Sequence, residues 1–227
     1  MELTREMIDG LPRTGPSDPI EFYRRPLVGW LFRERINMGL RMLARPAYER
    51  ALEVGYGAGA VLLTLAPRVA TLDGLDLDAE PEPVRVLLER RGFSAALARG
   101  SVCELPYGDA AFDLVVCFSV FEHLHEFERA LREVHRVLRA GGEFLLGMPA
   151  VNKMMEAGFR IIGFKGIEDH HVTTPRAVSE RFASVGFRVA RGLSGWSEIG
   201  ANRPSLGGEC KDRKPPKADV PRCRARF

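Results

Sequence analysis

The sequence predicts a doubly wound α/β fold, in which helices cover both faces of a mostly parallel β-sheet. Three observations predict it. Short apolar runs alternate with amphipathic helical patterns, a glycine-rich turn follows the first of these runs, and an aspartate ends the second. Strand–helix–strand units connect parallel strands through right-handed crossovers, so the sheet is expected to be buried on both faces.

The predicted elements follow from local pattern. Pro46 separates an arginine-rich amphipathic segment from the first strand, glycines end that strand, and Gly141-Gly142 is expected to end a helix. Pro149 is expected to end the strand that follows these glycines. We predict helices over residues 21–44, 60–68, 82–91, 126–138 and 175–185, and strands over 51–54, 71–76, 95–98, 112–118, 143–148 and 187–190, with 195–201 as the one candidate for a last strand.

Composition limits the class of protein. At 227 residues, 45% hydrophobic and 28% charged, the chain is long enough for one substantial core. No apolar run approaches the roughly 18 to 20 residues of a bilayer span, and the N-terminus lacks a secretory-signal pattern. We therefore expect a soluble, cytoplasmic protein. The four cysteines form no C-x-x-C pair, so we expect reduced thiols.

The domain organisation is predicted from the same patterns. Residues 1–19 are expected to be an irregular leader, and 20–200 a single domain whose residues 20–48 form a helical cap. Residues 201–227 carry a net charge of +5 and almost no large apolar side chains, so this basic tail is expected to be disordered. The rest of the chain sums to −2, which gives no support for a nucleic-acid-binding face.

The glycine turn is the sharpest local feature. Gly55, Gly57 and Gly59 lie between a strand and a helix, where glycine permits positive φ and close approach of backbone N–H groups to a ligand. In an open α/β sheet this edge binds ligands, so a nucleotide-like cofactor is implied. The spacing of Gly55, Gly57 and Ala60 also satisfies the dinucleotide pattern G-x-G-x-x-G/A, and Asp76 suits the ribose of either cofactor.

Glu53 favours one of the two cofactors. A carboxylate two residues before the first glycine is expected to point at the pocket, where it disfavours a pyrophosphate and suits a ligand with a cationic amino group.

At this point the chain resembles the class I S-adenosylmethionine-dependent methyltransferases, particularly the small bacterial type that acts on metabolites or lipids. The resemblance spans roughly residues 50 to 150 in order and spacing. It rests on residues 52–59, on 74–78, on the segment 100–124 and on 130–142.

The resemblance implies a set of cofactor contacts. Glu53 would contact the methionine amine, the glycine turn would pack on the methionine moiety, and Asp76 would hold the ribose hydroxyls. Relatives often carry an acid at position 101, where this chain has Ser101. The full set of cofactor-binding residues implied is Glu53, Gly55, Tyr56, Gly57, Gly59, Asp76, Leu77, Ser101, Val102, Phe118 and Ser119.

Methyl transfer from a sulfonium requires alignment of donor and acceptor and exclusion of water, while a general base is optional. His123 is the first candidate for a base, with a structural or cofactor-shaping role as the commoner alternative, and His170 and His171 come next. No metal site is expected, because adjacent histidines point apart on a regular backbone. Tyr23 or Phe22 could lie over the sulfonium, although aromatic residues at helical spacing are more often core.

The sequence therefore predicts a methyltransferase that uses S-adenosyl-L-methionine and acts on a small-molecule acceptor, such as a metabolite, quinone-like compound or lipid. The amphipathic segment 20–48 fits a lid over the acceptor, a membrane-surface helix or core packing, of which we favour the lid. The alternatives are an NAD(P)-dependent oxidoreductase and a non-catalytic cofactor-binding module. The acceptor, the atom methylated and the oligomeric state are left open.

Overall fold

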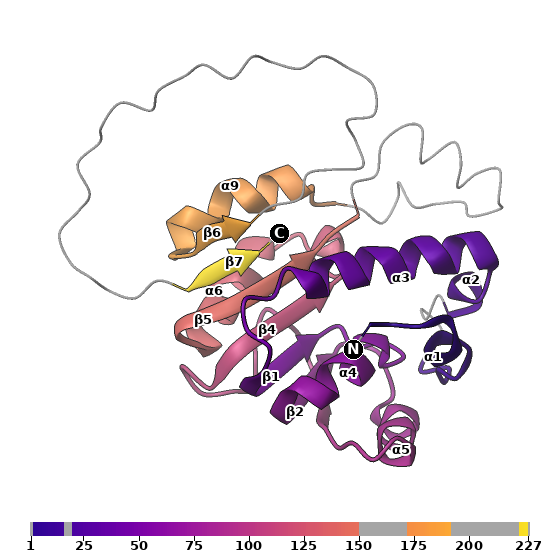
Figure 1. Cartoon of the computed structure of the whole chain (residues 1–227). Helices are drawn as coiled ribbons and strands as arrows, with labels where there is room; N and C mark the ends of the chain where they lie inside the picture. The colour runs from indigo at the N-terminus through magenta and orange to yellow at the C-terminus, as the bar shows by residue number, and fades with distance from the viewer. Residues whose placement is uncertain (1, 16–19, 150–171, 192–222, 227) are drawn as a thin grey trace.

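A seven-stranded parallel sheet forms the centre of the molecule (Figure 1). The structure is a computed structural model, and it describes residues 2–15, 20–149, 172–191 and 223–226. The strand order is β3-β2-β1-β4-β5-β7-β6, and every neighbouring pair is parallel. The predicted doubly wound α/β class is confirmed. The strands are β1 (Tyr48–Val54), β2 (Val69–Asp76), β3 (Ala96–Arg99), β4 (Phe112–Phe118), β5 (Leu138–Gly147), β6 (Arg188–Arg191) and β7 (Arg224–Arg226).

Helices cover both faces of the sheet. The first five helices, α1 through α5, pack against one face of the sheet through one apolar cluster. Helices α6 and α9 pack against the other face through a second cluster. Strand β1 serves both clusters, because Ala51 belongs to the first and Leu52 and Val54 to the second. The helices are α1 (Arg5–Asp9), α2 (Ile20–Tyr23), α3 (Pro26–Arg41), α4 (Ala60–Leu65), α5 (Pro81–Arg90), α6 (Phe127–Val137) and α9 (Pro175–Val185), with 3-10 turns η1 (Ala66–Arg68) and η2 (Phe121–His123).

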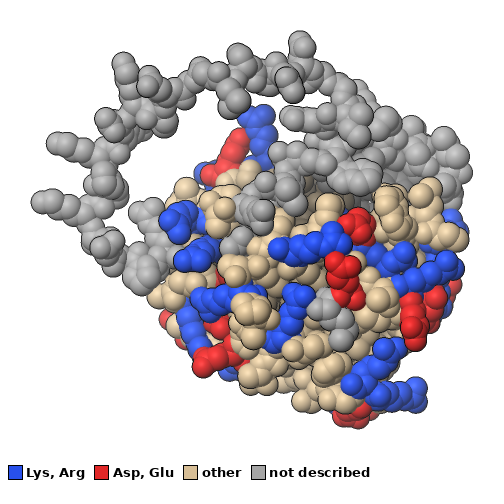
Figure 2. All heavy atoms as spheres, in the orientation of Figure 1, with Lys and Arg blue, Asp and Glu red and all other residues tan. Residues whose placement is uncertain are grey.

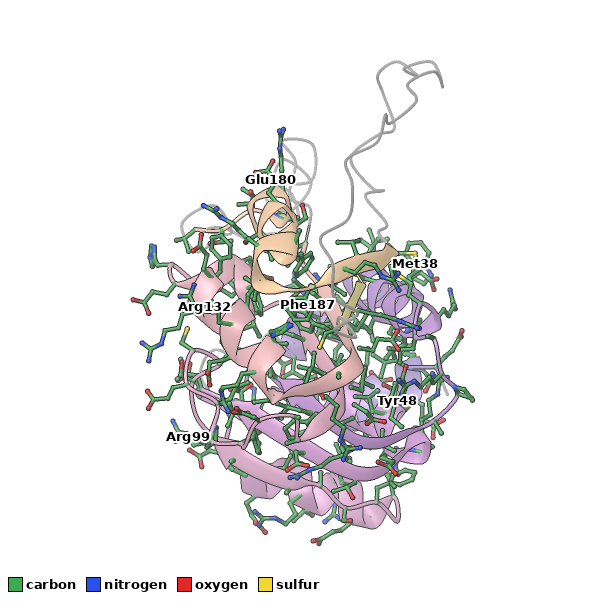
Figure 3. The ribbon with its side chains drawn as sticks, turned by 90° about the vertical axis from the view of Figure 1, so that its left-hand side faces the viewer. Met38, Tyr48, Arg99, Arg132, Glu180 and Phe187 are labelled. Carbon is green, nitrogen blue, oxygen red and sulfur yellow. The ribbon has the colours of Figure 1, made fainter. Side chains whose placement is uncertain are left out.

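Figure 3 shows how the side chains divide between surface and interior. Arg99 and Arg132 extend outward from the side of β3 and α6, whereas Phe187 lies inside, beneath α9. Phe187 packs against Phe144 and Phe182 with ring centroids 5.6 and 5.7 Å apart, so α9 is held to β5 by an aromatic contact.

Strand β4 and helix α9 have the predicted bounds, but the amphipathic segment 21–44 forms two helices instead of one. Pro26 begins α3 at its first turn, and Arg25 before it is extended, with φ −68° and ψ 137°. A proline has no N–H for the preceding helix and restricts the residue before it, so α2 ends at Tyr23.

The prediction of an irregular leader over residues 1–19 was wrong for residues 5–9. Helix α1 forms there, and the Thr4 side chain caps it by accepting a hydrogen bond from Met7 N. Asn37 of α3 accepts from Leu3 N at 2.8 Å and donates to Leu3 O at 3.1 Å. So short a helix is stabilised by tertiary burial, which a local pattern does not reveal. The buried residues within this helix and beside it in sequence are Leu3, Met7, Ile8 and Leu11.

Gly141 and Gly142 lie within a strand, and do not end a helix as predicted. Helix α6 ends at Val137 and β5 begins at Leu138. Gly141 has φ +76°, and the pairing of β4 with β5 shifts register between Phe112 and Leu114. The glycines therefore accommodate an irregularity at the start of the strand.

The prediction of a disordered tail over 201–227 was wrong for residues 223–226. Strand β7 lies between β5 and β6, and Cys223 and Ala225 are 3% and 0% exposed. Two neighbouring strands supply the hydrogen bonds and burial that the composition of the segment could not. The candidate last strand 195–201 lies outside the described residues.

Candidate functional site

The candidate site lies where the connections after β1 and β4 leave the sheet. These two strands are neighbours, but β1 leads towards β2 and β3 on one side, and β4 leads to β5 on the other. Such a switch point, at the carboxyl ends of the strands, is where open α/β sheets bind ligands. The two loops touch, because a Cβ at Gly55 after β1 would collide with the Val120 side chain after β4.

The three glycines of the turn all adopt positive φ. Gly55, Gly57 and Gly59 have φ of +77°, +48° and +84°. Gly55 N donates to Leu75 O at 2.7 Å, which ties the turn to the end of β2. A Cβ at Gly57 would have no heavy atom within 4 Å, so open space lies beside this residue. The turn thus has both the conformation and the room for a ligand to approach its backbone.

Glu53 is a buried carboxyl that lacks a full set of partners. It is 2% exposed, and its Oε2 has no hydrogen-bond partner. Burial raises the pKa of Glu53 well above its ordinary value, the charge of Asp76 raises it further, and a backbone hydrogen bond from Leu62 lowers it. A cationic or hydrogen-bond-donating ligand group would satisfy this carboxyl.

Asp76 is the hydrogen-bonding centre of the turn. Its Oδ2 accepts from Gly57 N at 2.9 Å, and its Oδ1 accepts from Asp78 N and Ala79 N, each at 2.9 Å. A carboxylate has about four acceptor positions, so capacity remains for a ligand hydroxyl. Leu77, which follows it, is 65% exposed.

Tyr56 and Val102 lie inside the protein. Tyr56 is 3% exposed, and its hydroxyl donates to Ala79 O at 3.2 Å. Burial raises the pKa of Tyr56 to about 12. Val102 is 5% exposed and belongs to the apolar cluster beneath α6. Ser101 is exposed, and its Oγ accepts from Cys103 N at 3.2 Å.

Helix α3 closes over the end of β4. The Phe118 ring packs on α3 so tightly that a Cβ at Gly39 would lie 2.8 Å from its Cζ. Ser119 adopts φ +57°, donates from its N–H to Gly147 O at 2.9 Å, and accepts at Oγ from the Arg35 guanidinium. The predicted cap therefore contacts the residues expected to line the donor pocket.

The histidines differ in their positions. His123 is exposed at the end of η2, and its N–H donates to Val120 O at 3.0 Å. His170 and His171 lie outside the described residues. His135 packs edge-on against Phe187 with centroids 5.1 Å apart, and burial lowers its pKa, which fits a packing role.

Tyr23 stacks on Phe32 with ring centroids 3.6 Å apart, so its ring is engaged within α2 and α3. The side chain of Phe22 is outside what the structure describes.

Sequence reasoning missed Glu122. This residue of η2 is 1% exposed, and its Oε2 has no hydrogen-bond partner. The only local signal was its place in Phe121-Glu122-His123 directly after a strand end. An acid in a short polar loop is normally solvated, so burial could not be predicted from the sequence.

Within the described residues, no group of three or more His, Cys, Asp or Glu side chains could hold a metal ion. No described helix is long and apolar enough to cross a bilayer. On the face shown in Figure 2, Lys and Arg side chains are interspersed with Asp and Glu.

Comparison with known proteins identifies the central part of the chain. Residues 52–146, which run from within β1 into β5 and include the glycine turn and Asp76, match the methyltransferase domain family. This region is a methyltransferase domain. The resemblance seen in the sequence is thereby confirmed, and relatives from Mycolicibacterium smegmatis and Mycobacterium tuberculosis are named as probable S-adenosylmethionine-dependent methyltransferases.

Among the curated relatives of the methyltransferase domain, two that are reported below are named for different acceptors, and YcgJ is named as uncharacterized. The methyltransferase YcgJ of Bacillus subtilis is 32% identical over 130 residues, covering 56% of this chain and 50% of the relative. A demethylmenaquinone methyltransferase of Deinococcus radiodurans is 29% identical, covering 49% and 48%. A sarcosine/dimethylglycine N-methyltransferase of Halorhodospira halochloris is 32% identical, covering 51% and 42%. This chain thus spans about half the length of these relatives.

Solved structures share the fold. The crystal structure of YcgJ aligns with a TM-score of 0.56 at 23% identity, covering 67% of this chain and 68% of that one. The [4+2]-cyclase SpnF aligns with a TM-score of 0.54 at 20% identity, covering 81% and 67%. Because a cyclase shares this fold, the fold alone does not determine the reaction.

Proposed function

We propose that the protein transfers a methyl group from S-adenosylmethionine to a small-molecule acceptor held between α3 and the loop after β4. The observation that carries the proposal is the buried, partly unsatisfied carboxyl of Glu53 beside the glycine turn. A ligand amino group would satisfy Glu53 and favour its ionised form, whereas the pyrophosphate of a dinucleotide offers this carboxyl neither a cation nor a hydrogen-bond donor.

The site residues fit the donor in the following way. Glu53 would hold the methionine amine, the turn 55–59 would pack on the methionine moiety, and Asp76 would accept from the ribose hydroxyls. Ser101 and Val102 would flank the adenine, while Phe118 and Ser119 would line the pocket near the sulfur. The donor supplies a methyl group on a sulfonium when bound, and the chain aligns the acceptor and excludes water.

Helix α3 would cover the acceptor. Its contacts with Phe118 and Ser119 support a position beside the proposed donor pocket, and it exposes Leu27 and Trp30, which are 63% and 47% accessible. These apolar side chains support a quinone-like or lipid acceptor, delivered through peripheral contact with a membrane surface. The demethylmenaquinone enzyme among the relatives is consistent with this class.

Differential ligand protection tests the proposal. S-adenosylhomocysteine should raise the melting temperature of the full chain, whereas NAD and NADP should not. The nicotinamide alternative retains support from the spacing of Gly55, Gly57 and Ala60, so protection by NAD or NADP alone would overturn the proposal.

The role of His123 is tested by measuring turnover and cofactor affinity separately once an acceptor is known. If His123 is a general base, His123→Ala should lower turnover more than cofactor affinity. Equal losses would assign it to shaping of the cofactor pocket.

A further inference from the structure

Glu122 lies in η2, directly after β4, and is an ionisable group to which the proposed function gives no role. Its side chain is almost fully buried, and one carboxyl oxygen has no hydrogen-bond partner. Its backbone carbonyl accepts from Val172 N at 2.8 Å and from Thr173 N at 3.2 Å, which holds η2 in place. A buried carboxyl in this state costs stability, so its presence calls for a functional explanation.

Glu122 lies near Glu53 and Asp76, the two acids of the candidate site, because all three act on the same buried thiol. The charges of Glu122, Glu53 and Asp76 all raise the pKa of the buried Cys117 thiol, although burial is the largest cause. Cys117 is the penultimate residue of β4. Glu53 pairs with Val116 beside Cys117, and Glu122 follows β4 in η2, so these carboxyls lie around the carboxyl end of this strand.

Nearby cations offset the burial of the Glu122 carboxyl only in part. Burial raises the pKa of Glu122, while a hydrogen bond from its own backbone, then the charges of Arg35 and His123, and last a hydrogen bond from the Ser119 side chain lower it. The Arg35 guanidinium donates to Ser119 Oγ, and among the described residues no ion pair joins it to Glu122. Arg35 therefore lies near the carboxyl without neutralising it through direct contact, which leaves Glu122 able to respond to a second cation.

We propose that Glu122 is the counter-charge for the sulfonium of S-adenosylmethionine and makes the site prefer the donor over its product, S-adenosylhomocysteine. This inference rests on the proposed function. Donor and product share the amine, carboxylate, ribose and adenine, so contacts from Glu53 and Asp76 hold both alike. Only the donor carries a positively charged sulfur, so a buried carboxylate beside the sulfur would stabilise the bound donor and not the bound product.

Calorimetric titration of the full chain with three ligands tests the proposal without an acceptor. The ligands are S-adenosylmethionine, S-adenosylhomocysteine, and sinefungin, which carries a cationic amine near the position of the sulfonium. Glu122→Gln should weaken the two cationic ligands about tenfold and change the affinity of S-adenosylhomocysteine less than about twofold. Glu122→Asp keeps the charge and should retain the preference.

Two control variants separate charge from general damage. Glu53→Gln should weaken all three ligands by a similar factor, because each carries the amine. Glu104→Gln, at a surface carboxyl that is 84% exposed, should change none of them. If Glu122→Gln fails to fold, Glu122→Met supplies the uncharged variant, since an apolar side chain has no amide to satisfy.

The outcomes are distinguishable. Equal weakening of all three ligands by the uncharged variant would show that Glu122 only supports the loop, and unchanged affinities would show that it does not face the sulfur. Either result overturns the inference. If the wild-type chain binds none of the three ligands, the proposed function fails instead.

Discussion

Glu53, for which we propose a binding role, is a residue that lowers the stability of the ligand-free protein. Its carboxyl is buried beside the glycine turn, and burial raises its pKa well above the ordinary value. The folded protein holds this proton to higher pH than the unfolded chain does. The free energy of unfolding therefore falls as pH rises above the ordinary pKa of a glutamate, until Glu53 ionises.

We expect Glu53→Gln to stabilise the ligand-free protein at about pH 8 by roughly 1–3 kcal/mol relative to wild type, because the amide cannot ionise. At about pH 4 the two proteins should differ much less, since Glu53 of wild type is then largely protonated in both the folded and the unfolded state. Urea denaturation at the two pH values measures this difference. A variant that is less stable than wild type at the higher pH would contradict the assignment of Glu53 as an uncompensated acid.

At the scale of elements, a polar contact joins the segment between α3 and β1 to strand β5. The Tyr48 hydroxyl donates to Glu143 Oε2 at 2.6 Å, and Ala44 N donates to Glu143 Oε1 at 3.0 Å. Glu143 is 2% exposed, so these donors satisfy an otherwise buried carboxyl. Tyr48 is labelled in Figure 3 at the start of β1, and the contact anchors the N-terminal helices to the sheet.

Removing the Tyr48 hydroxyl should destabilise the folded protein. Tyr48→Phe is expected to lower the free energy of unfolding by about 1–3 kcal/mol, because Glu143 loses a buried hydrogen bond. Tyr107→Phe is the matched control, since the buried Tyr107 hydroxyl has no hydrogen-bond partner, and its loss should be neutral or stabilising. Both are measured by chemical denaturation. Equal effects of the two substitutions would show that the Tyr48 contact does not matter.

The close contact between α3 and β4 gives a second prediction at this scale. A Cβ at Gly39 would lie 2.8 Å from Phe118 Cζ, so Gly39→Val should force Phe118 or α3 to move and destabilise the protein by about 1–3 kcal/mol. Gly108→Val is the control, because a Cβ at the exposed Gly108 meets no atom within 4 Å. Thermal unfolding of the pair checks this contact, and a Gly39 variant as stable as the control would refute it.

At the scale of the whole molecule, a segment distant in sequence completes the sheet. Strand β7 pairs with β5 through Glu143↔Arg224 and with β6 through Val189↔Ala225. Figure 1 shows it between these strands, although it lies at the C-terminal end of the chain. The sheet therefore depends on residues that composition alone assigns to a tail.

Ala225→Asp tests this dependence. A charge at a fully buried position should lower the free energy of unfolding by at least about 2 kcal/mol. Arg224→Thr, at the exposed neighbouring position, should leave it within about 0.5 kcal/mol. Denaturant titration measures both. If Ala225→Asp has no effect, residues 223–226 do not contribute to the folded sheet.

The sequence by itself determined the parallel sheet, the glycine turn and the acids Glu53 and Asp76 at the ends of their strands. Each depends on a local signal, namely apolar periodicity, positive φ at glycine, or the position of an acid next to a turn.

Only the tertiary structure decided that residues 5–9 are helical, that 224–226 form a strand, and that Glu122 is buried near Arg35. These features arise from contacts between segments far apart in the chain. Burial and strand pairing are supplied by those distant partners, so no local window of sequence contains the information that specifies them.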